Sequence, residues 1–249
     1  MKGRTIAVER LEDGRTGAAL VVDGRIEDLV LDARAGDATP LPEAVYLAVV
    51  DRRPKGGSAF MRLGPDLGGF LREAGEAREG SAVPVQVTGH AEPGKAPPVT
   101  RRILLKGRLA ILTPGAPGIN VSRRIRGGEE AARLADLGRA AMAEAGLDPE
   151  GDAGLILRSS AEGAGPVPLA REVAALAARL RTVEAAEGAP ALVLAAPDAA
   201  ELALREWEGE AVEDGFDRFG VWDEIERLRG AEAPLPSGGS LVIEPGRTL

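Results

Sequence analysis

Two phenylalanines and one lysine in the first half of the chain have the side-chain types that bind a nucleic-acid strand. Phe60 and Phe70 are two of only four phenylalanines in 249 residues, and Lys95 follows them in a segment rich in glycine and proline. Single-stranded nucleic acids bind by stacking bases on aromatic rings while cations contact the backbone. The two rings could instead fill the core of a β-barrel, and the spacing alone favours that second interpretation.

A second candidate group has the chemistry of a phosphate site. Arg158 directly follows the apolar run 155–157 and is itself followed by Ser159. A guanidinium beside a hydroxyl at the end of a strand can bind a phosphate through several hydrogen bonds. The alternative is an ordinary surface arginine paired with a nearby carboxylate such as Glu162.

The distribution of charge allows a cationic surface on an acidic chain. The formal net charge is −8 and the isoelectric point is near 5.0, which over the whole chain argues against nucleic-acid binding. Between residues 95 and 126, however, there are basic side chains and no Asp or Glu: Lys95, Arg101, Arg102, Lys106, Arg108, Arg123, Arg124 and Arg126. Phosphate binding depends on the local field rather than on the total charge, so Arg123 and Arg124 remain candidates for a phosphate-binding surface.

Composition excludes several kinds of chemistry. The chain has no cysteine, which excludes disulfides, zinc–thiolate sites and iron–sulfur clusters. His90 is the single histidine, so any metal site would rest on carboxylates, and its position beside Gly89 in an expected loop favours a structural role. No apolar run approaches about 18 residues and no signal peptide is recognisable, so we expect a cytoplasmic protein without a membrane span.

The elements that must position these residues begin with short strands. Residues 5–32 predict a three-stranded meander with Asp-Gly turns at 13–14 and 23–24. After a boundary rich in proline and glycine at 33–43, further strands are expected at even spacing: 45–50, 58–63, 69–71, 82–88 and 99–105. This pattern is typical of a small Greek-key barrel of the OB type.

Helices enter the pattern after residue 106. Strands at 109–112 and 152–158 and helices at 129–145 and 169–186 predict a compact α/β unit. The last part of the chain predicts, in order, a buried strand at 191–195, a helix at 197–207, a solvated acidic loop at 208–217, a helix at 219–229 and a strand at 240–244. The fold class expected is α+β.

Taken in order, these segments resemble the ribonuclease E/G family of bacterial endoribonucleases. The similarity rests on motifs spread over nearly the whole chain: Ala59-Phe60 with Gly69-Phe70-Leu71, Gly94-Lys95, residues 107–125 with their Ser-Arg-Arg-Ile, residues 155–163 with their Leu-Arg-Ser-Ser, and the Leu-Pro-Ser-Gly-Gly-Ser segment that begins at Leu235. No single motif is decisive, but their order and spacing make the resemblance specific.

The resemblance implies a domain organisation. Residues 41–105 would be an S1 domain of the OB type, and residues 106–186 an α/β 5′-sensor region. Both would be inserted into a split ribonuclease H-like subdomain made of residues 1–40 and 187–249, which would lead into a catalytic subdomain that this sequence does not include.

The resemblance also implies residue roles. Single-stranded RNA would be contacted by Phe60, Phe70 and Lys95. A 5′-monophosphate would be bound by the following residues: Arg158, Ser159, Arg123, Arg124, Gly107 and Ile111. Ser159 replaces a threonine of the family and keeps the hydroxyl.

Departures from the family leave the enzymatic assignment open. Family catalysis uses two aspartates and an asparagine that bind Mg²⁺ for phosphodiester hydrolysis, and these would lie beyond Leu249, so we expect no catalytic residue and no metal ligand in this chain. Glu244 aligns with a strand-end acid, the zinc-link cysteines of the family are absent, and Met61-Arg62 stand where the family has Val-Asp.

Two functions therefore stay open. The first is single-stranded RNA binding and 5′-monophosphate sensing within a ribonuclease E/G-type endoribonuclease of RNA processing and decay. The second is a non-catalytic RNA-binding or protein-interaction scaffold of the same architecture. The oligomeric state is open as well, with a homo-oligomer among the options.

Overall fold

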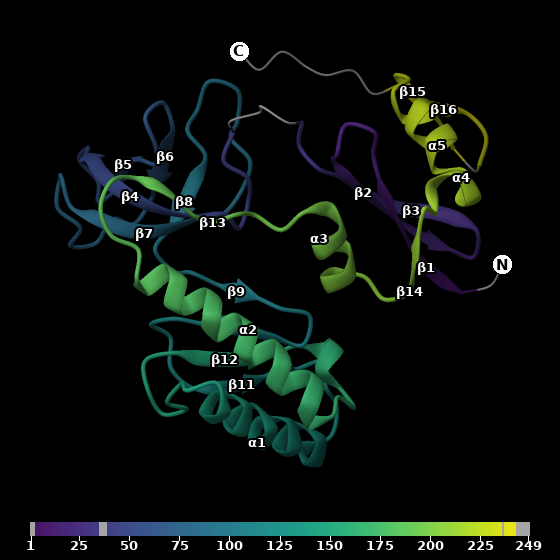
Figure 1. Ribbon diagram of the computed structural model, residues 1–249. Coiled ribbons are helices and arrows are strands. Elements are labelled where there is room, and N and C mark those ends of the chain that lie inside the picture. Colours follow the sequence, from purple (N-terminus) through teal and green to yellow (C-terminus); the bar gives the residue numbers. More distant parts are fainter. Residues whose placement is uncertain (1–2, 35–38, 236, 243–249) are drawn as a thin grey trace. The chain divides into compact units, whose positions relative to one another are not determined.

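The computed structural model describes residues 3–34, 39–235 and 237–242, and the chain divides into two compact units (Figure 1). One unit combines Met1–Ala35 with Asp198–Leu249, and the other is Gly36–Pro197. Helices and strands occur in both, so the expected α+β class is confirmed. Among the described residues, no helix combines the length and the apolar character needed to cross a membrane.

The discontinuous unit is built on a four-stranded sheet. Strands β1 (Arg4–Arg10), β2 (Thr16–Val22) and β3 (Arg25–Leu31) form the predicted antiparallel meander. The turn between β2 and β3 places Asp23 at φ 50° and Gly24 at φ 82°. Two consecutive residues with positive φ match the right-handed twist of a tight hairpin, which is why an Asp-Gly pair is favoured there.

The acidic segment 208–217 contains a strand, so its prediction as a solvated loop is wrong. Residues Glu210–Glu213 form β14, which pairs in parallel with β1. Phe216, at the end of the same segment, is fully buried against Ala7, Ala19 and Val221. The partner of this strand lies about two hundred residues away, and its charged side chains concealed it from local sequence patterns.

The remaining elements of this unit are α3 (Ala199–Glu206), α4 (Phe216–Phe219), α5 (Val221–Leu228), β15 (Glu232–Pro234) and β16 (Ser240–Val242). The helix predicted at 197–207 is confirmed and begins with a capping box between Asp198 and Glu201. The helix predicted at 219–229 is confirmed as α5, and Gly220, with φ 68°, separates it from the preceding α4. Ile243 and Glu244, the end of the last predicted strand, lie outside the described residues.

The Gly36–Pro197 unit contains a closed five-stranded barrel. Its strands are β4 (Val45–Arg52), β5 (Ala59–Arg62), β6 (Gly68–Leu71), β7 (Ala82–Val87) and β8 (Pro98–Thr100). They pair in the order β4-β5-β6-β8-β7, and β7 closes the barrel by pairing with β4. This order is consistent with an OB-type barrel. The last strand predicted for the barrel, 99–105, is shorter than expected: β8 ends at Thr100.

An α/β part follows the barrel in the same unit. Its sheet has the order β11 (Ile119–Val121), β12 (Gly154–Leu157), β10 (Ala110–Thr113) and β9 (Leu105–Lys106). The predicted helices are confirmed as α1 (Gly128–Glu144) and α2 (Pro166–Glu184), with a short 3₁₀ turn at Ser159–Ala161. One face of the sheet packs with both helices into a single core (Figure 1). Burial of these apolar faces stabilises the part.

The strand predicted at 191–195 exists as β13 (Ala191–Leu194), but it is not buried as expected. It pairs antiparallel with β4, and its first residues are exposed. The strand thus extends the sheet of the barrel at an edge, and the division between the two compact units falls after Pro197.

Candidate nucleic-acid interface

The Phe60 and Phe70 rings lie on the outer surface of the barrel. The two residues are direct partners across β5 and β6. Their neighbours Ala59, Met61 and Leu71 point into the barrel core, so strand alternation directs both rings outward. The rings are half-buried, with centroids 5.4 Å apart and planes tilted by 59°. The interpretation that they fill the core is therefore wrong.

Lys95 lies in a turn beside this pair. Gly94 takes φ 75°, and the backbone N–H of Phe70 donates to the carbonyl oxygen of Pro97 at 2.9 Å, so the segment leading into β8 runs along β6. The Lys95 ammonium contacts Glu92 at 2.6 Å, and this contact lowers the pKa of the Glu92 carboxyl. Both side chains are about 70% exposed (69% and 70%), and an ion pair so open to water contributes little to stability. A phosphate could therefore replace Glu92 at low cost.

Three segments of the α/β part meet at one edge of its sheet. β11 and β12 run in parallel with Val121 opposite Leu157, so the residues after both strands emerge together. β10 runs the other way, and the N–H of Arg158 donates to the carbonyl oxygen of Leu109 at 2.7 Å. The edge thus brings together residues 107–109, 122–124 and 158–159, which the sequence analysis had linked only by resemblance.

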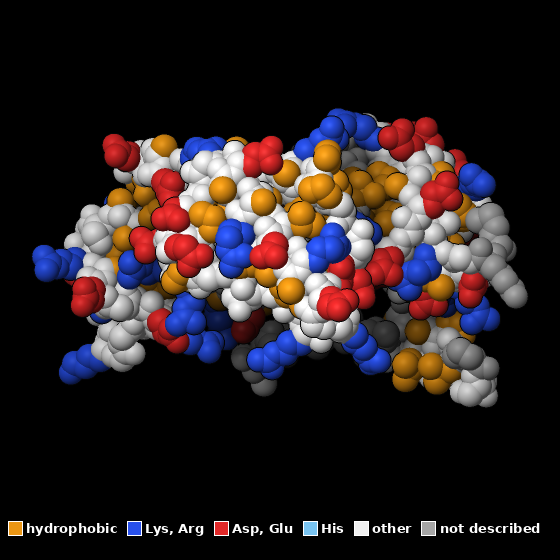
Figure 2. Space-filling view, turned by 90° about the horizontal axis from the view of Figure 1, so that it is seen from below, with side chains coloured by type: hydrophobic (Ala, Val, Ile, Leu, Met, Phe, Trp, Pro, Cys, Tyr) orange, Lys and Arg blue, Asp and Glu red, His pale blue; other side chains and the backbone are white. Residues whose placement is uncertain are grey.

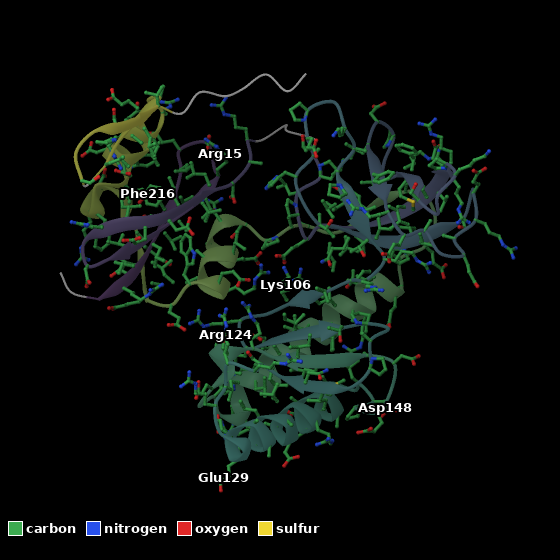
Figure 3. All side chains as sticks on the ribbon, turned by 180° about the vertical axis from the view of Figure 1, so that it is seen from behind. Arg15, Lys106, Arg124, Glu129, Asp148 and Phe216 are labelled. Carbon is green, nitrogen blue, oxygen red and sulfur yellow. The ribbon has the colours of Figure 1, made fainter. Side chains whose placement is uncertain are left out.

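Arg123 and Arg124 are exposed in the turn after β11. Buried Ile125 anchors this turn, since its N–H donates to the carbonyl oxygen of Ser122. Figure 3 shows Arg124 and Asp148 at opposite ends of the α/β part. The two arginines therefore add positive charge at the edge where Arg158 lies, away from the acidic loop that follows α1.

The Arg158 side chain is held by backbone at this edge. Its guanidinium Nη1 donates to the carbonyl oxygen of Gly107 at 2.6 Å. Ser159 begins the 3₁₀ turn next to it and is half-buried. Ile111, within β10, is half-buried, while its neighbours Ala110 and Leu112 face the helices.

A residue that the sequence analysis missed organises the start of β10. The carboxylate of Glu172, on α2, accepts hydrogen bonds from three consecutive backbone N–H groups: Arg108 at 2.9 Å, Leu109 at 2.7 Å and Ala110 at 2.8 Å. A Cβ on Gly107 would lie 2.4 Å from Glu172 Oε1, which explains why glycine is needed there. No local motif marks Glu172, because its partners lie more than sixty positions away (64, 63 and 62).

A second carboxylate fixes the loop that follows Arg158 and Ser159. Glu130 accepts hydrogen bonds from Arg133 Nη2 at 2.7 Å and from the backbone N–H of Gly163 at 2.9 Å. The Arg133 hydrogen bond, together with that from Gly163, lowers the pKa of Glu130 from 4.5 to about 2. The N-terminal turn of α1 is thereby tied to the loop.

The Mg²⁺ ion that the resemblance implies has no fitting ligand set in the described part of the chain. Across residues 3–34, 39–235 and 237–242, no group of three or more Asp, Glu or His side chains is arranged to hold a metal ion.

Acidic and basic side chains are interspersed on the face of the molecule seen from below (Figure 2). Figure 2 shows Asp and Glu side chains beside Lys and Arg side chains on the face seen from below. Such interspersed charge produces no extended field of one sign.

A closed five-stranded barrel with an exposed aromatic pair, joined to an α/β part with an arginine-lined edge, defines an α+β protein with a candidate nucleic-acid interface. Residues 104–214 match the model of the Ribonuclease E/G family. In an alignment 293 positions long, the chain is 29% identical to Ribonuclease E of Nostoc sp.. Both findings support the resemblance to the ribonuclease E/G family that the motifs predicted. The alignment covers 93% of this chain but 41% of that relative, so the chain spans about two fifths of the relative's length.

Proposed function

We propose that this chain is the part of a ribonuclease E/G-type endoribonuclease that binds single-stranded RNA and senses its 5′ end. The longer enzyme would hydrolyse RNA phosphodiester bonds in RNA processing and decay. The observation that carries the proposal is the outward-facing Phe60–Phe70 pair on a closed barrel of OB strand order. OB-type barrels bind single strands on such aromatic surfaces.

In this proposal residues 41–105 act as an S1 domain and residues 106–186 as a 5′ sensor. Residues 1–40 and 187–249 would be the two parts of a ribonuclease H-like subdomain without catalytic residues of its own. The metal-binding carboxylates, with their Mg²⁺, would belong to a segment after Leu249. The match to the family model, the similar relative and the strand order of the barrel support this division.

The barrel would hold the strand by two interactions. Bases stack on Phe60 and Phe70, because every base has an aromatic face, and this makes binding tolerant of sequence. The Lys95 ammonium exchanges Glu92 for a backbone phosphate. Phosphate contacts of this kind make affinity fall as salt rises.

The α/β part would bind the 5′-monophosphate. Arg158 offers guanidinium N–H groups and Ser159 a hydroxyl, a combination suited to phosphate oxygens. Gly107 and Ile111 would line the pocket, and Arg123 and Arg124 would supply the surrounding positive field. A 5′-hydroxyl end lacks the charge that these groups recognise.

The test compares two short RNAs of one sequence, with a 5′-monophosphate or a 5′-hydroxyl, by fluorescence anisotropy at low ionic strength. We expect the chain to prefer the monophosphate and the Arg158→Ala variant to lose that preference while still binding both RNAs. Arg139→Ala, which removes the same charge from the exposed face of α1, serves as the control.

Two outcomes contradict the proposal. Unchanged preference in Arg158→Ala would remove the sensor assignment. No RNA binding by the parent chain at low ionic strength would remove RNA binding as well and favour the protein-interaction scaffold.

A further inference from the structure

A β-bulge in β4 places an arginine on the aromatic surface of the barrel. Val50 pairs with Met61 and Arg52 pairs with Phe60, so two residues of β4 oppose one residue of β5. Val50 is buried in the barrel core, and strict alternation would direct Arg52 inward as well. The bulge reverses this direction and leaves Arg52 exposed. Bulges commonly re-aim a side chain in this way beside functional surfaces.

Arg52 lies directly against the Phe60 ring. Its guanidinium carbon is 4.4 Å from the ring centroid, a distance typical of a cation–π contact. Within the described part of the chain, Arg52 has no carboxylate at ion-pair distance. Arg52, Phe60 and Phe70 thus form a continuous row across the neighbouring strands β4, β5 and β6.

The surface beside this row is open and basic. Arg62 follows Phe60 by two positions in β5 and shares its outward face. It is opposite Gly68, which has no side chain and leaves the surface next to the rings uncovered. A strand of nucleic acid stacked on the rings would therefore pass beside the cationic side chains of Arg52 on β4 and Arg62 on β5.

We propose that Arg52 is a further RNA-binding residue, whose guanidinium is held by the Phe60 ring and contacts a backbone phosphate next to a stacked base. This inference rests on the proposed function of the barrel and adds a second cation to its binding surface. The physical basis is that the cation–π contact orders the guanidinium before RNA binds, which reduces the loss of side-chain entropy on binding.

The experiment measures affinity of the full chain for a 5′-hydroxyl oligouridylate of about ten nucleotides, a length within the site size of one OB fold. The 5′-hydroxyl end keeps the sensor edge out of the measurement. Affinity is determined by anisotropy over a series of salt concentrations for the parent, Arg52→Gln, Arg52→Lys and Phe60→Leu. Arg78→Gln, which removes a charge from an exposed barrel loop, is the matched control.

Loss of one phosphate contact predicts that Arg52→Gln binds about fivefold more weakly and that its log–log salt slope is smaller by about 1. Arg52→Lys should keep the parental slope because the charge remains. Phe60→Leu should weaken binding mainly through lost stacking, and Arg78→Gln should change neither quantity. Melting temperatures of the variants verify that the barrel stays folded.

The outcomes separate the two proposals. If Phe60→Leu weakens binding while Arg52→Gln keeps the parental affinity and slope, Arg52 only covers the ring and the inference is overturned, whereas the proposed function stands. If the parent does not bind the oligouridylate, or if Phe60→Leu binds as the parent does, the proposed function of the barrel fails and the role of Arg52 fails with it.

Discussion

The carboxylate of Glu172 accepts a hydrogen bond from the backbone N–H of Leu109 at 2.7 Å, and this contact joins helix α2 to the first residues of β10. The neighbouring N–H groups of Arg108 and Ala110 donate to the same carboxylate. The carbonyl oxygen of Gly107, one residue earlier, accepts the hydrogen bond from Arg158. Glu172 thus positions the backbone on which the Arg158 guanidinium rests.

Replacing Glu172 should lower the stability of the folded chain. Glu172→Ala leaves three backbone N–H groups without their acceptor, and we expect a loss of about 2 to 4 kcal/mol in the free energy of unfolding. Glu172→Gln keeps one acceptor oxygen, so its free energy of unfolding should lie between those of the parent and Glu172→Ala. The measurement is urea denaturation followed by circular dichroism, with the exposed neighbour Arg171→Ala as control. A loss no larger than that of the control would contradict the positioning role.

Gly107→Ala should lower stability by displacing the Glu172 carboxylate. The added methyl group would lie 2.4 Å from Glu172 Oε1, so the carboxylate must move away from its three donors. The two substitutions then disturb one interaction, and the double variant Gly107→Ala/Glu172→Ala should be more stable than the sum of the single losses implies, by about 1 kcal/mol or more. A double-mutant cycle from urea denaturation measures this coupling, and additive losses would show that the two residues act independently.

Glu130 should make stability depend on pH in the acidic range. Its pKa is about 2 in the folded chain against 4.5 ordinarily, because Arg133 and the Gly163 N–H stabilise the carboxylate. A depressed folded-state pKa adds stability above pH 4.5 that is lost as pH falls toward 2. Glu130→Gln should therefore be less stable than the parent at neutral pH, and the difference should shrink on acidification below that range.

Denaturation of both proteins in urea at several pH values tests this dependence. Glu129→Gln, at the exposed neighbouring position, controls for the loss of one charge in the first turn of α1. A stability difference between the parent and Glu130→Gln that stays constant down to pH 3 would be incompatible with a carboxylate titrating as the structure implies.

Phe216 should be essential to the unit that joins the two ends of the chain. Its ring is fully buried and meets Trp222 edge-on, with centroids 5.2 Å apart. Phe216→Ala should cost about 3 to 5 kcal/mol of unfolding free energy, as large-to-small core substitutions do. Both tryptophans, Trp207 and Trp222, lie in this unit, so tryptophan fluorescence reports its unfolding. Leu228→Ala, at a 59% exposed position, should cost far less.

Local patterns predicted the elements whose determinants lie close together in sequence. The hairpin at Asp23-Gly24 follows from the two residues that must take positive φ, and α2 follows from apolar residues at helical spacing. β14 escaped prediction because its partner β1 lies at the other end of the chain and because glutamates at both ends of the strand resemble a loop. β13 was found but taken as buried, since an apolar run does not distinguish an edge strand from a central one.

In the candidate site, too, the sequence indicated residues recognisable by type and missed those placed by long-range contacts. The side-chain types of Phe60, Phe70, Lys95 and Arg158 suggested nucleic-acid binding, but the sequence spacing favoured a place in the barrel core for the two rings. Arg52 could not be found, because only the bulge brings it to the outer face and a regular alternation predicts the opposite. Long-range hydrogen bonds such as those of Glu172 cannot be predicted from the spacing of residues along the sequence.

The pairing of β13 with β4 has a consequence for engineering. Leu194 lies opposite Val45, so the first and the last strand of the Gly36–Pro197 unit are neighbours. A unit whose first and last strands are neighbours can be cut out and replaced by a short connection at a small entropic cost, because the gap left to bridge is short. We therefore expect the barrel with its α/β part to be separable as an independent cassette and open to circular permutation.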